Sequence, residues 1–550
     1  MTFAELLTRL GGMGRFQVTY VAALALPLLM LASHNLLQNF TAGVPEHRCR
    51  PRPGADNGTA GLPPLRVTSP ADGRCRRYVE PQWHLLEANG TVAARNGSEE
   101  APTEPCRDGW TYQEGVFAHT IVTEWDLVCE SKTLRQAAQS IYMAGILLGS
   151  CLFGILSDKF GRRALLIWCY LQLGVTGTCT ALAPSFAIYC LCRCLAGLAM
   201  SGVSLNSASL CMEWIPTELR AIVGTANGYC YTLGQFVLAA AAFGLPRWRW
   251  LQLAVSLPFY LFFLYSWFFV ESARWQVISG RPDLALEGLR KVARVNGRKE
   301  EGDKLDVEAL QALVGREQRP SGAARSLGAL IRTRGMRTVS CGVAFIWFST
   351  SFAYYGLAMD LQHFGVDVYL TQVAFGAVDI PAKLASALAI TGVGRRAAQA
   401  GALGLAGLCI LANIFVPQEL RILRMVFAVV GKGSLAASFN CAYIFSGELF
   451  PTVIRQTGMG LGGTMARVGS MVAPLVRMTG DAFPALPLVI YGAAPVVSAV
   501  ATCFLPETRN MPLPETVEDV ERRAGHLEDE EPQVTVPLAP TKADAGKDGV

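Results

Sequence analysis

The sequence predicts an all-α membrane protein made of two similar halves, each with six transmembrane helices. Three short patterns each occur twice, about 235 residues apart: Gly-Arg-Arg at 161–163 and 394–396, the segments 213–220 and 448–455, and a looser pair that begins at Glu271 and Glu507. Hydrophobic residues make up 51% of the chain and charged residues 17%, a combination that is rare in soluble proteins of this length. Parallel repeats in a membrane protein are typical of transporters that have a substrate site between two halves.

Twelve segments are apolar and long enough, at roughly twenty residues, to cross the hydrocarbon core of a membrane. They are predicted at about 16–36, 137–157, 164–183, 186–211, 221–244 and 250–270, and again at about 338–358, 368–391, 397–416, 424–446, 456–477 and 486–504. The chain thus divides into an N-terminal half at 1–270, a linker at 271–337, a C-terminal half at 338–505 and a tail at 506–550.

The positions of Lys and Arg predict the orientation of these spans, because cytoplasmic loops are enriched in positive charge. Most basic residues near the span ends fall on one side, together with the linker, which is dense in Arg and Lys. Both termini and the linker are therefore predicted to be cytoplasmic. The linker contains helix-like stretches at 284–295 and 307–314. The tail at 506–550 ends in acidic and Pro-rich sequence, so we expect it to be disordered.

The largest segment outside the membrane, about 40–134, follows the first span and is predicted to be extracellular. It holds Asn-X-Ser/Thr sequons, which accept N-linked glycans. Four cysteines in an oxidising compartment predict two disulfides, with three pairings possible. The sequons begin at Asn39 (close to the membrane end), Asn57, Asn89 and Asn96, and the cysteines are Cys49, Cys75, Cys106 and Cys129.

The loop between the second and third spans reads Gly-Ile-Leu-Ser-Asp-Lys-Phe-Gly-Arg-Arg at 154–163 and resembles the signature loop of the major facilitator superfamily. The resemblance implies the major facilitator fold. It also implies that the acid and arginines pair with charges at the ends of the fourth and eleventh spans, which holds the cytoplasmic side closed. Ion pairs that break and reform can bias a rigid-body movement between two states. The candidate gating residues are Asp158, Arg162, Arg163, Glu213, Arg220, Glu448 and Arg455.

Charged residues inside the spans are candidate site residues, because an ion in the membrane needs a partner or a water-filled space. Arg193, which matches an arginine common in the superfamily, and Lys432, which two glycines flank, are interpreted as structural. Lys383 follows Asp379 by one turn, so this acid could neutralise it, whereas Arg467 has no acid within a turn. Surplus positive charge recognises anions, and an arginine can bind a carboxylate in a bidentate manner.

Aromatic residues accompany these charges. Trp347, Tyr354 and Tyr355 lie on the seventh predicted span, Tyr231 on the fifth and Phe439 on the tenth. Together with a pair of cations they predict a site for amphipathic anions with an aromatic or apolar body. The tyrosine hydroxyls can also donate hydrogen bonds to a carboxylate.

Further segments resemble the organic ion transporters, solute carrier family 22. They are residues 1–7, 34–42, 123–129, 271–275, 351–356 and 451–460. Within that family, cation transporters have an acid where Arg467 stands and anion transporters have an arginine, and Lys383 likewise matches the anion branch. The chain is most similar to the renal para-aminohippurate/dicarboxylate exchangers.

This resemblance implies uptake of small organic anions in exchange for intracellular 2-oxoglutarate or a similar dicarboxylate. It places the protein among the lipids of the plasma membrane, on the basolateral side in epithelia, and implies no cofactor, metal or nucleic acid. The residues to which it gives a role in binding are Asn35, Tyr231, Trp347, Tyr354, Tyr355, Lys383, Phe439 and Arg467, with Ser204 as a contact for an inorganic anion such as chloride.

Two alternatives within the superfamily stay open, an organic cation carrier and a neutral-solute, sugar-like facilitator. Segment 271–275 also resembles sugar porters, but a sugar site gives no reason for Arg467. An enzyme is not indicated, because the six histidines are scattered and no phosphate-binding loop, nucleophile elbow or metal-ligand spacing appears.

Overall fold

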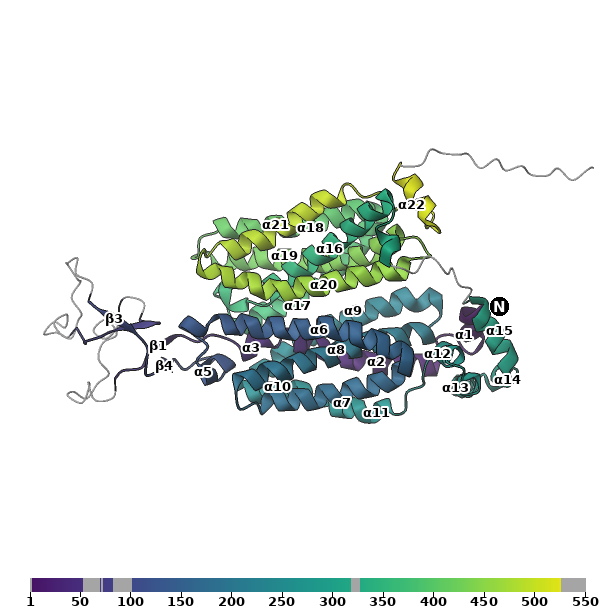
Figure 1. Cartoon of the computed structure of the whole chain (residues 1–550), viewed down its shortest axis with the longest axis horizontal. Helices are drawn as coiled ribbons and strands as arrows, with labels where there is room; N and C mark the ends of the chain where they lie inside the picture. Colours follow the sequence, from purple (N-terminus) through teal and green to yellow (C-terminus); the bar gives the residue numbers. More distant parts are fainter. Residues whose placement is uncertain (1, 53–69, 71–72, 83–100, 318–326, 526–550) are drawn as a thin grey trace, which may run out of the picture.

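The structure is a computed structural model that describes residues 2–52, 70, 73–82, 101–317 and 327–525 of the 550-residue chain. Two groups of long helices pack side by side (Figure 1). Short strands lie beyond one end of these groups, and several short helices lie at the other end. This is the two-halved arrangement that the sequence repeats predict.

The first half contains five long helices followed by two shorter ones. The long helices are α2 (Arg15–Leu36), α6 (Thr133–Phe160), α7 (Arg162–Ala181), α8 (Phe186–Trp214) and α9 (Arg220–Gly244). The predicted span at 250–270 corresponds to two consecutive helices, α10 (Trp248–Ser256) and α11 (Pro258–Ser266), joined by Leu257. Pro258 has no N–H to continue the hydrogen bonds of α10, so a new helix begins there.

The second half contains six helices. They are α16 (Arg334–Ala358), α17 (Val368–Gly392), α18 (Arg395–Phe415), α19 (Arg421–Leu449), α20 (Arg455–Arg477) and α21 (Leu486–Thr502). Eight helices of the described part are long and apolar enough to cross a membrane by length and composition. Of the others, α9 and α20 are less apolar, and α21 has 17 residues.

The repeated sequence patterns form equivalent structures in the two halves. Gly161 precedes α7 with a φ of 95°, and Gly394 precedes α18 with a φ of 119°, a backbone region that favours glycine. A Cβ would also collide with the carboxylate of Glu271 at Gly161, at 2.5 Å, and with that of Glu507 at Gly394, at 2.8 Å. The positive φ therefore favours glycine at both positions, and a larger residue would also displace the glutamate carboxylate that lies there.

The linker folds against the first half as a group of short helices. They are α12 (Ala273–Ile278), α13 (Pro282–Val295), α14 (Lys299–Asp303) and α15 (Val307–Glu317), and the N-terminal α1 (Phe3–Arg9) packs with them. Asn296 joins these parts, because its side chain accepts from Phe16 N at 3.0 Å and donates to Leu10 O at 3.0 Å. The expected helical stretches of the linker are present.

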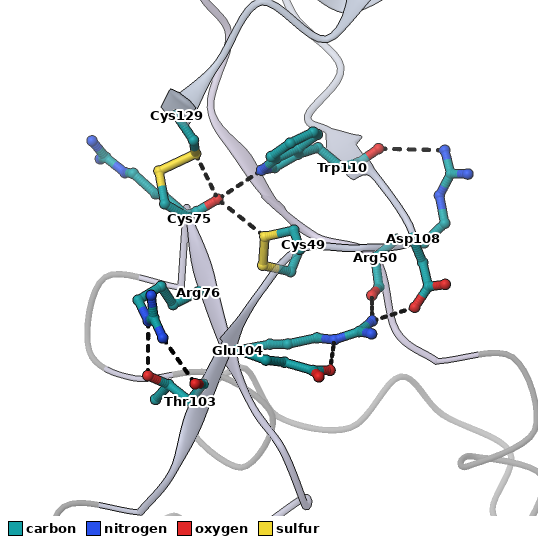
Figure 2. Close-up of a disulfide and its surroundings, with 12 residues drawn as sticks. Cys49, Arg50, Cys75, Arg76, Thr103, Glu104, Asp108, Trp110 and Cys129 are labelled. Carbon is teal, nitrogen blue, oxygen red and sulfur yellow. Dashed lines mark hydrogen bonds and ion pairs between the residues drawn. A yellow bond between two sulfur atoms is a disulfide. The ribbon is translucent and has the colours of Figure 1, made fainter. Parts of the chain in front are cut away.

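The loop after the first span adds small β-sheets to the otherwise helical fold. Strand β1 (His47–Cys49) pairs antiparallel with β4 (Trp110–Tyr112), and β2 (Arg76–Tyr78) pairs with β3 (Thr103–Pro105). Of the three possible pairings, the structure has Cys49–Cys106 and Cys75–Cys129, which lie close together where the strands meet (Figure 2). Short helices α3 (Gln38–Thr41) and α5 (Ile121–Trp125) connect this region to the first half.

The prediction of a glycan acceptor at Asn39 is wrong for this conformation. Asn39 lies in α3, is 6% exposed, and its Nδ2 donates to Ala358 O in the second half at 2.7 Å. A glycan on this nitrogen would have no space. Asn57, Asn89 and Asn96 lie outside the described residues.

We therefore expect glycosylation only at the three later sequons. Replacing Asn57, Asn89 and Asn96 together with Gln should reduce the apparent mass in mammalian cells to that of the enzymatically deglycosylated protein. Asn39→Gln alone should leave the gel mobility unchanged, and serves as the matched control. A faster band for Asn39→Gln would contradict the burial of this residue.

The expectation of disorder over the whole tail, 506–550, is corrected for residues 506–525. Pro514 O accepts a hydrogen bond from Thr452 N at 3.0 Å, and helix α22 (Val517–Arg523) follows. Glu521 of α22 accepts hydrogen bonds from Gly335 N and Met336 N at the start of α16, at 2.8 and 3.3 Å. This part of the tail is ordered because its polar atoms complete helix ends of the second half. Residues 526–550 lie outside the described part.

Candidate functional site

Asn35 of α2 is a buried amide at the interface between the two halves. Its Nδ2 donates to the Tyr355 hydroxyl of α16 at 3.4 Å, and its Oδ1 accepts from the Tyr142 hydroxyl of α6 at 2.8 Å. The side chain is 6% exposed. One residue therefore connects three helices and both halves, as expected for a site that lies between them.

Aromatic side chains from the second half extend from this point. Tyr354 and Tyr355 have ring centroids 5.3 Å apart, and Tyr354 lies 5.5 Å from Phe439 of α19. Trp347 lies 6.2 Å from Phe439, and its Nε1 donates to Ser446 Oγ at 3.0 Å. Tyr354 meets Tyr355 and Phe439 edge to face, Trp347 is tilted against Phe439, and these rings together form an apolar wall.

Tyr231 of α9 adds a hydroxyl from the first half to the same group. It interacts with Asn35 and with the Tyr354 and Tyr355 side chains. The structure therefore brings five of the predicted binding residues together. Asn35, Tyr231, Tyr354 and Tyr355 carry amide or hydroxyl groups that can donate hydrogen bonds, and Phe439 packs its ring against Tyr354.

Arg467 lies midway along α20 and is half-buried. Its charge is close to Tyr355 and to Cys151 of α6, but its guanidinium makes no hydrogen bond or ion pair with any residue that the structure describes. Gly463, one turn earlier, leaves room for it, since a Cβ there would lie 3.2 Å from Nη1. An unpaired cation at this depth needs water or a ligand as its partner.

Lys383 of α17 extends toward α9 in the first half. Its Nζ donates to Gly228 O at 2.8 Å and to Thr232 Oγ1 at 3.3 Å, and it lies 5.5 Å from the Tyr229 ring centroid. No acid of the described residues forms an ion pair with it. Lys383 and Arg467 thus both carry positive charge at the interface between the halves.

Asp379, which the sequence suggested as a partner of Lys383, forms its ion pair with Lys432 of α19 instead, at 2.9 Å. Lys432 is 0% exposed, and its Nζ also donates to Phe375 O at 2.7 Å and to Gln235 Oε1 of α9 at 2.9 Å. Because every donor of the ammonium is used, the structural interpretation of Lys432 fits its surroundings.

Arg193 of α8 is buried without an acid among the described residues. It is 1% exposed, and its guanidinium lies over the Tyr142 ring with 4.0 Å to the centroid. This stacking holds the tyrosine whose hydroxyl orients Asn35. Ser204, also on α8, is half-buried, and its side chain makes no hydrogen bond within the described chain, so the structure does not link it to the other predicted residues.

The sequence reasoning missed Tyr142 and Gln235. Neither carries a charge and neither belongs to a repeated pattern, so no rule about single ions in membranes selects them. A polar uncharged residue in the middle of an apolar span is the one signal that could have drawn attention to them. Their importance depends on partners that lie on other helices.

The gating candidates form two equivalent networks at the end of the helices that the sequence predicts to be cytoplasmic. Arg162 Nε lies 3.6 Å from Glu213 and its Nη2 3.2 Å from Asp158, while in the second half Arg395 Nε lies 3.2 Å from Glu448. An ion pair with the end of the fourth span is therefore present, whereas the expected ion pair with the end of the eleventh span is not formed among the described residues. The remaining arginines contact backbone carbonyls: Arg163 that of Trp267, Arg220 that of Ile215 and Arg455 that of Phe450.

The third repeated pattern completes these networks. The carboxylate of Glu271 accepts from the backbone N–H groups of Arg162 and Arg163 at 3.2 and 3.0 Å, and Glu507 does the same for the first residues of α18 at 3.0 and 3.2 Å. Each acid satisfies the free N–H groups of a helix start. Burial raises the pKa of Glu271. Burial alone would also raise the pKa of Glu507, but backbone hydrogen bonds lower it.

Comparison with known proteins agrees with this arrangement. The family model described as "Sugar (and other) transporter" matches residues 90–519. The chain is 53% identical to solute carrier family 22 member 6-B of Xenopus laevis, over 98% of this chain and 99% of that protein. It is 51% identical to solute carrier family 22 member 6 of Rattus norvegicus, over 95% of each chain.

Among solved structures, the fold is similar to the inward-open conformation of the xylose transporter XylE from E. coli. The TM-score is 0.61 at 16% identity, covering 92% of this chain and 99% of that chain. A partially occluded inward-open conformation of the same transporter gives a TM-score of 0.60 at 17% identity, covering 90% and 98%. The chain therefore belongs to solute carrier family 22 of the major facilitator superfamily and is a multi-pass membrane transporter, not an enzyme.

Proposed function

We propose that this protein takes up amphipathic organic anions in exchange for an intracellular dicarboxylate such as 2-oxoglutarate, by alternating access. The observation that carries the proposal is the pair Arg467 and Lys383, two cations at the interface between the halves that form no ion pair with a described residue. Asn35 and the tyrosine hydroxyls supply neutral donors beside them. The aromatic rings supply an apolar wall for the body of the substrate.

A neutral-solute facilitator fits these residues less well. Sugars are bound by uncharged hydrogen-bonding groups, and an unpaired arginine in the membrane costs at least a few kcal/mol without serving such a ligand. An organic cation would meet repulsion from Arg467 and Lys383. A carboxylate, in contrast, offers two oxygens to the planar guanidinium and compensates its charge.

Contacts on the extracellular side support alternating access. Gln362, in the turn after α16, accepts from Val44 N at 2.8 Å and donates to Val44 O at 3.0 Å, so the loop after the first span is bound to the second half. Asn39 donates to Ala358 O across the same boundary. Opening the extracellular side by rotation of the halves would break these hydrogen bonds.

At the cytoplasmic end, the ion pairs of the gating residues stay within one half among the described residues. Among the described residues, hydrogen bonds between the halves are thus present on the side of the predicted extracellular loop, whereas the ion pairs of the gating residues do not cross from one half to the other. We assign this conformation to the state in which substrate exchanges with the cytoplasm. The orientation, with both termini in the cytoplasm, a place in the plasma membrane on the basolateral side of epithelia, and an inorganic anion such as chloride near Ser204 are parts of the same proposal.

Counterflow in membrane vesicles tests the exchange. Uptake of labelled para-aminohippurate should rise several-fold when the vesicles are preloaded with 2-oxoglutarate, because the return step is then made by a loaded carrier. Preloading with an uncharged sugar is the control and should give no stimulation. Uptake of labelled sugar, or of an organic cation, in place of the anion would overturn the proposal.

A gating prediction follows from the cytoplasmic network. Asp158→Asn removes an acid that contacts Arg162 but touches none of the binding residues. We expect the maximal exchange rate to fall several-fold while the KM for para-aminohippurate stays within about twofold, since a gating element changes opening rates. Lys159→Gln, next to it in sequence, is the matched control. A large rise in KM at an unchanged maximal rate would show that Asp158 acts on binding instead.

A further inference from the structure

Gln235 of α9 is a fully buried residue that contacts both members of the Lys432–Asp379 ion pair. Its Nε2 donates to Asp379 Oδ2 at 2.8 Å, and its Oε1 accepts from Lys432 Nζ at 2.9 Å. Gln235 belongs to the first half, whereas Asp379 and Lys432 belong to the second. One uncharged amide therefore completes a buried ion pair across the interface.

Asp379 has a second cation within reach. Lys383 lies one turn later on α17, and side chains four residues apart on a helix are neighbours that form ion pairs readily. In the structure Lys383 is instead bound to Gly228 O and Thr232 Oγ1 of α9. The acid that both lysines could use is thus held by Lys432.

One face of α9 determines that Asp379 binds Lys432 and that Lys383 binds α9. Gly228, Thr232 and Gln235 are spaced i, i+4 and i+7 and so lie on the same side of the helix. The first two receive Lys383, and the third donates to the acid. A buried carboxylate oxygen needs a donor. Asp379 Oδ2 also accepts from Lys432 Nζ at 2.9 Å. Without the Gln235 amide, Lys432 would be its only donor, and the ammonium of Lys383, on the next turn of α17, could take the place of the lost amide.

We propose that Gln235 is a positioning residue that holds Asp379 on Lys432 and thereby reserves the charge of Lys383 for the transported anion. This rests on the proposed function. Arg467 serves the first carboxylate of a substrate, and Lys383 is the second positive charge. Gln235 therefore sets the preference for dicarboxylates over monocarboxylates.

The test compares two anions in vesicles that contain the full-length protein. Gln235→Met keeps the length of the side chain and removes both hydrogen bonds. The KM for 2-oxoglutarate should rise about tenfold, the effect of losing one charge contact, while the KM for para-aminohippurate stays within about twofold. Gln399→Met is the matched control, because Gln399 is also fully buried but donates to Ser438 within the second half, at 2.7 Å. For Gln399→Met, the ratio of the KM for 2-oxoglutarate to the KM for para-aminohippurate should equal that of the wild type.

Two further variants separate this role from a structural one. In an Asp379→Asn/Lys432→Met background no acid remains to neutralise Lys383, so adding Gln235→Met should leave the KM ratio unchanged. Gln235→Asn has a side chain that is one methylene shorter, so its amide cannot reach both partners. It should shift the KM ratio in the same direction as Gln235→Met and can replace that variant if Gln235→Met is poorly expressed.

Several results would overturn the proposal. Gln235→Met that lowers the maximal rate or surface abundance but keeps the KM ratio would show a structural role only. Pro381, which lies inside α17 between Asp379 and Lys383, would then be the feature that separates the two charges. A shift that persists in the Asp379→Asn/Lys432→Met background would exclude action through Asp379. A wild-type protein that transports neither anion would overturn the proposed function itself, and this inference with it.

Discussion

Replacing Arg467 with Asp should abolish uptake of organic anions by a protein that still reaches the cell surface. The change removes one of the two cations at the interface and places a negative charge next to Tyr355, where the substrate carboxylate is expected. Losing a charge-assisted contact costs roughly 1.5–3 kcal/mol, and repulsion adds to this cost. Uptake of para-aminohippurate, normalised to surface protein, is the measurement.

Arg467→Lys separates charge from geometry in the same assay. Lysine keeps the positive charge but cannot offer two parallel donors, so the affinity for anions should fall about ten- to hundredfold while transport remains detectable. Arg294→Asp, on the exposed face of linker helix α13, makes the same change of charge outside the membrane and should leave uptake intact. Normal 2-oxoglutarate-driven uptake by a well-expressed Arg467→Asp protein would refute the assignment.

Asp379→Asn should destabilise the protein more than any other single substitution discussed here. It leaves Lys432, with 0% exposure, without a counter-charge, and removing one partner of a buried ion pair typically costs about 3–5 kcal/mol. We expect a lower melting temperature of the purified protein and low surface abundance.

The double variant Asp379→Asn/Lys432→Met should recover most of this loss, because replacing a buried ion pair by groups of similar volume is often nearly neutral. The measurement is the melting temperature in detergent of the purified double variant and of Asp379→Asn alone. A double variant as unstable as Asp379→Asn alone would mean that the surroundings, and not the unpaired ammonium, determine the effect.

The sequence allowed the helices and the two-half arrangement to be predicted because these depend on local properties, the length of apolar segments and the repetition of short patterns. Arg467 could be selected for the same reason, since the cost of a charge in a membrane can be judged from one position. The partner of Asp379 could not be predicted from the sequence. Lys383 is four residues away and Lys432 is 53 residues away, and only the packing of α17, α19 and α9 decides between them.

The extracellular loop shows a similar limit. Its cysteines predicted two disulfides, but the choice of Cys49–Cys106 and Cys75–Cys129 follows from the pairing of strands that are too short to recognise in the sequence. Asn39 matched a glycosylation sequon, yet helix α3 turns it toward the second half. Sequons and cysteines in a sequence show where a glycan or a disulfide can form. The three-dimensional surroundings determine whether it forms and with which partner.

The shared role of Glu271 and Glu507 bears on where each repeated half of the chain ends. Both acids lie beyond the last helix of their half, and both satisfy the start of that half's third long helix. The repeated structural unit therefore extends beyond the long helices and includes the first residues of the linker and of the tail. Split versions of the protein should accordingly be divided after α12, because a fragment that stops at residue 270 would lack the glutamate that its own helix needs.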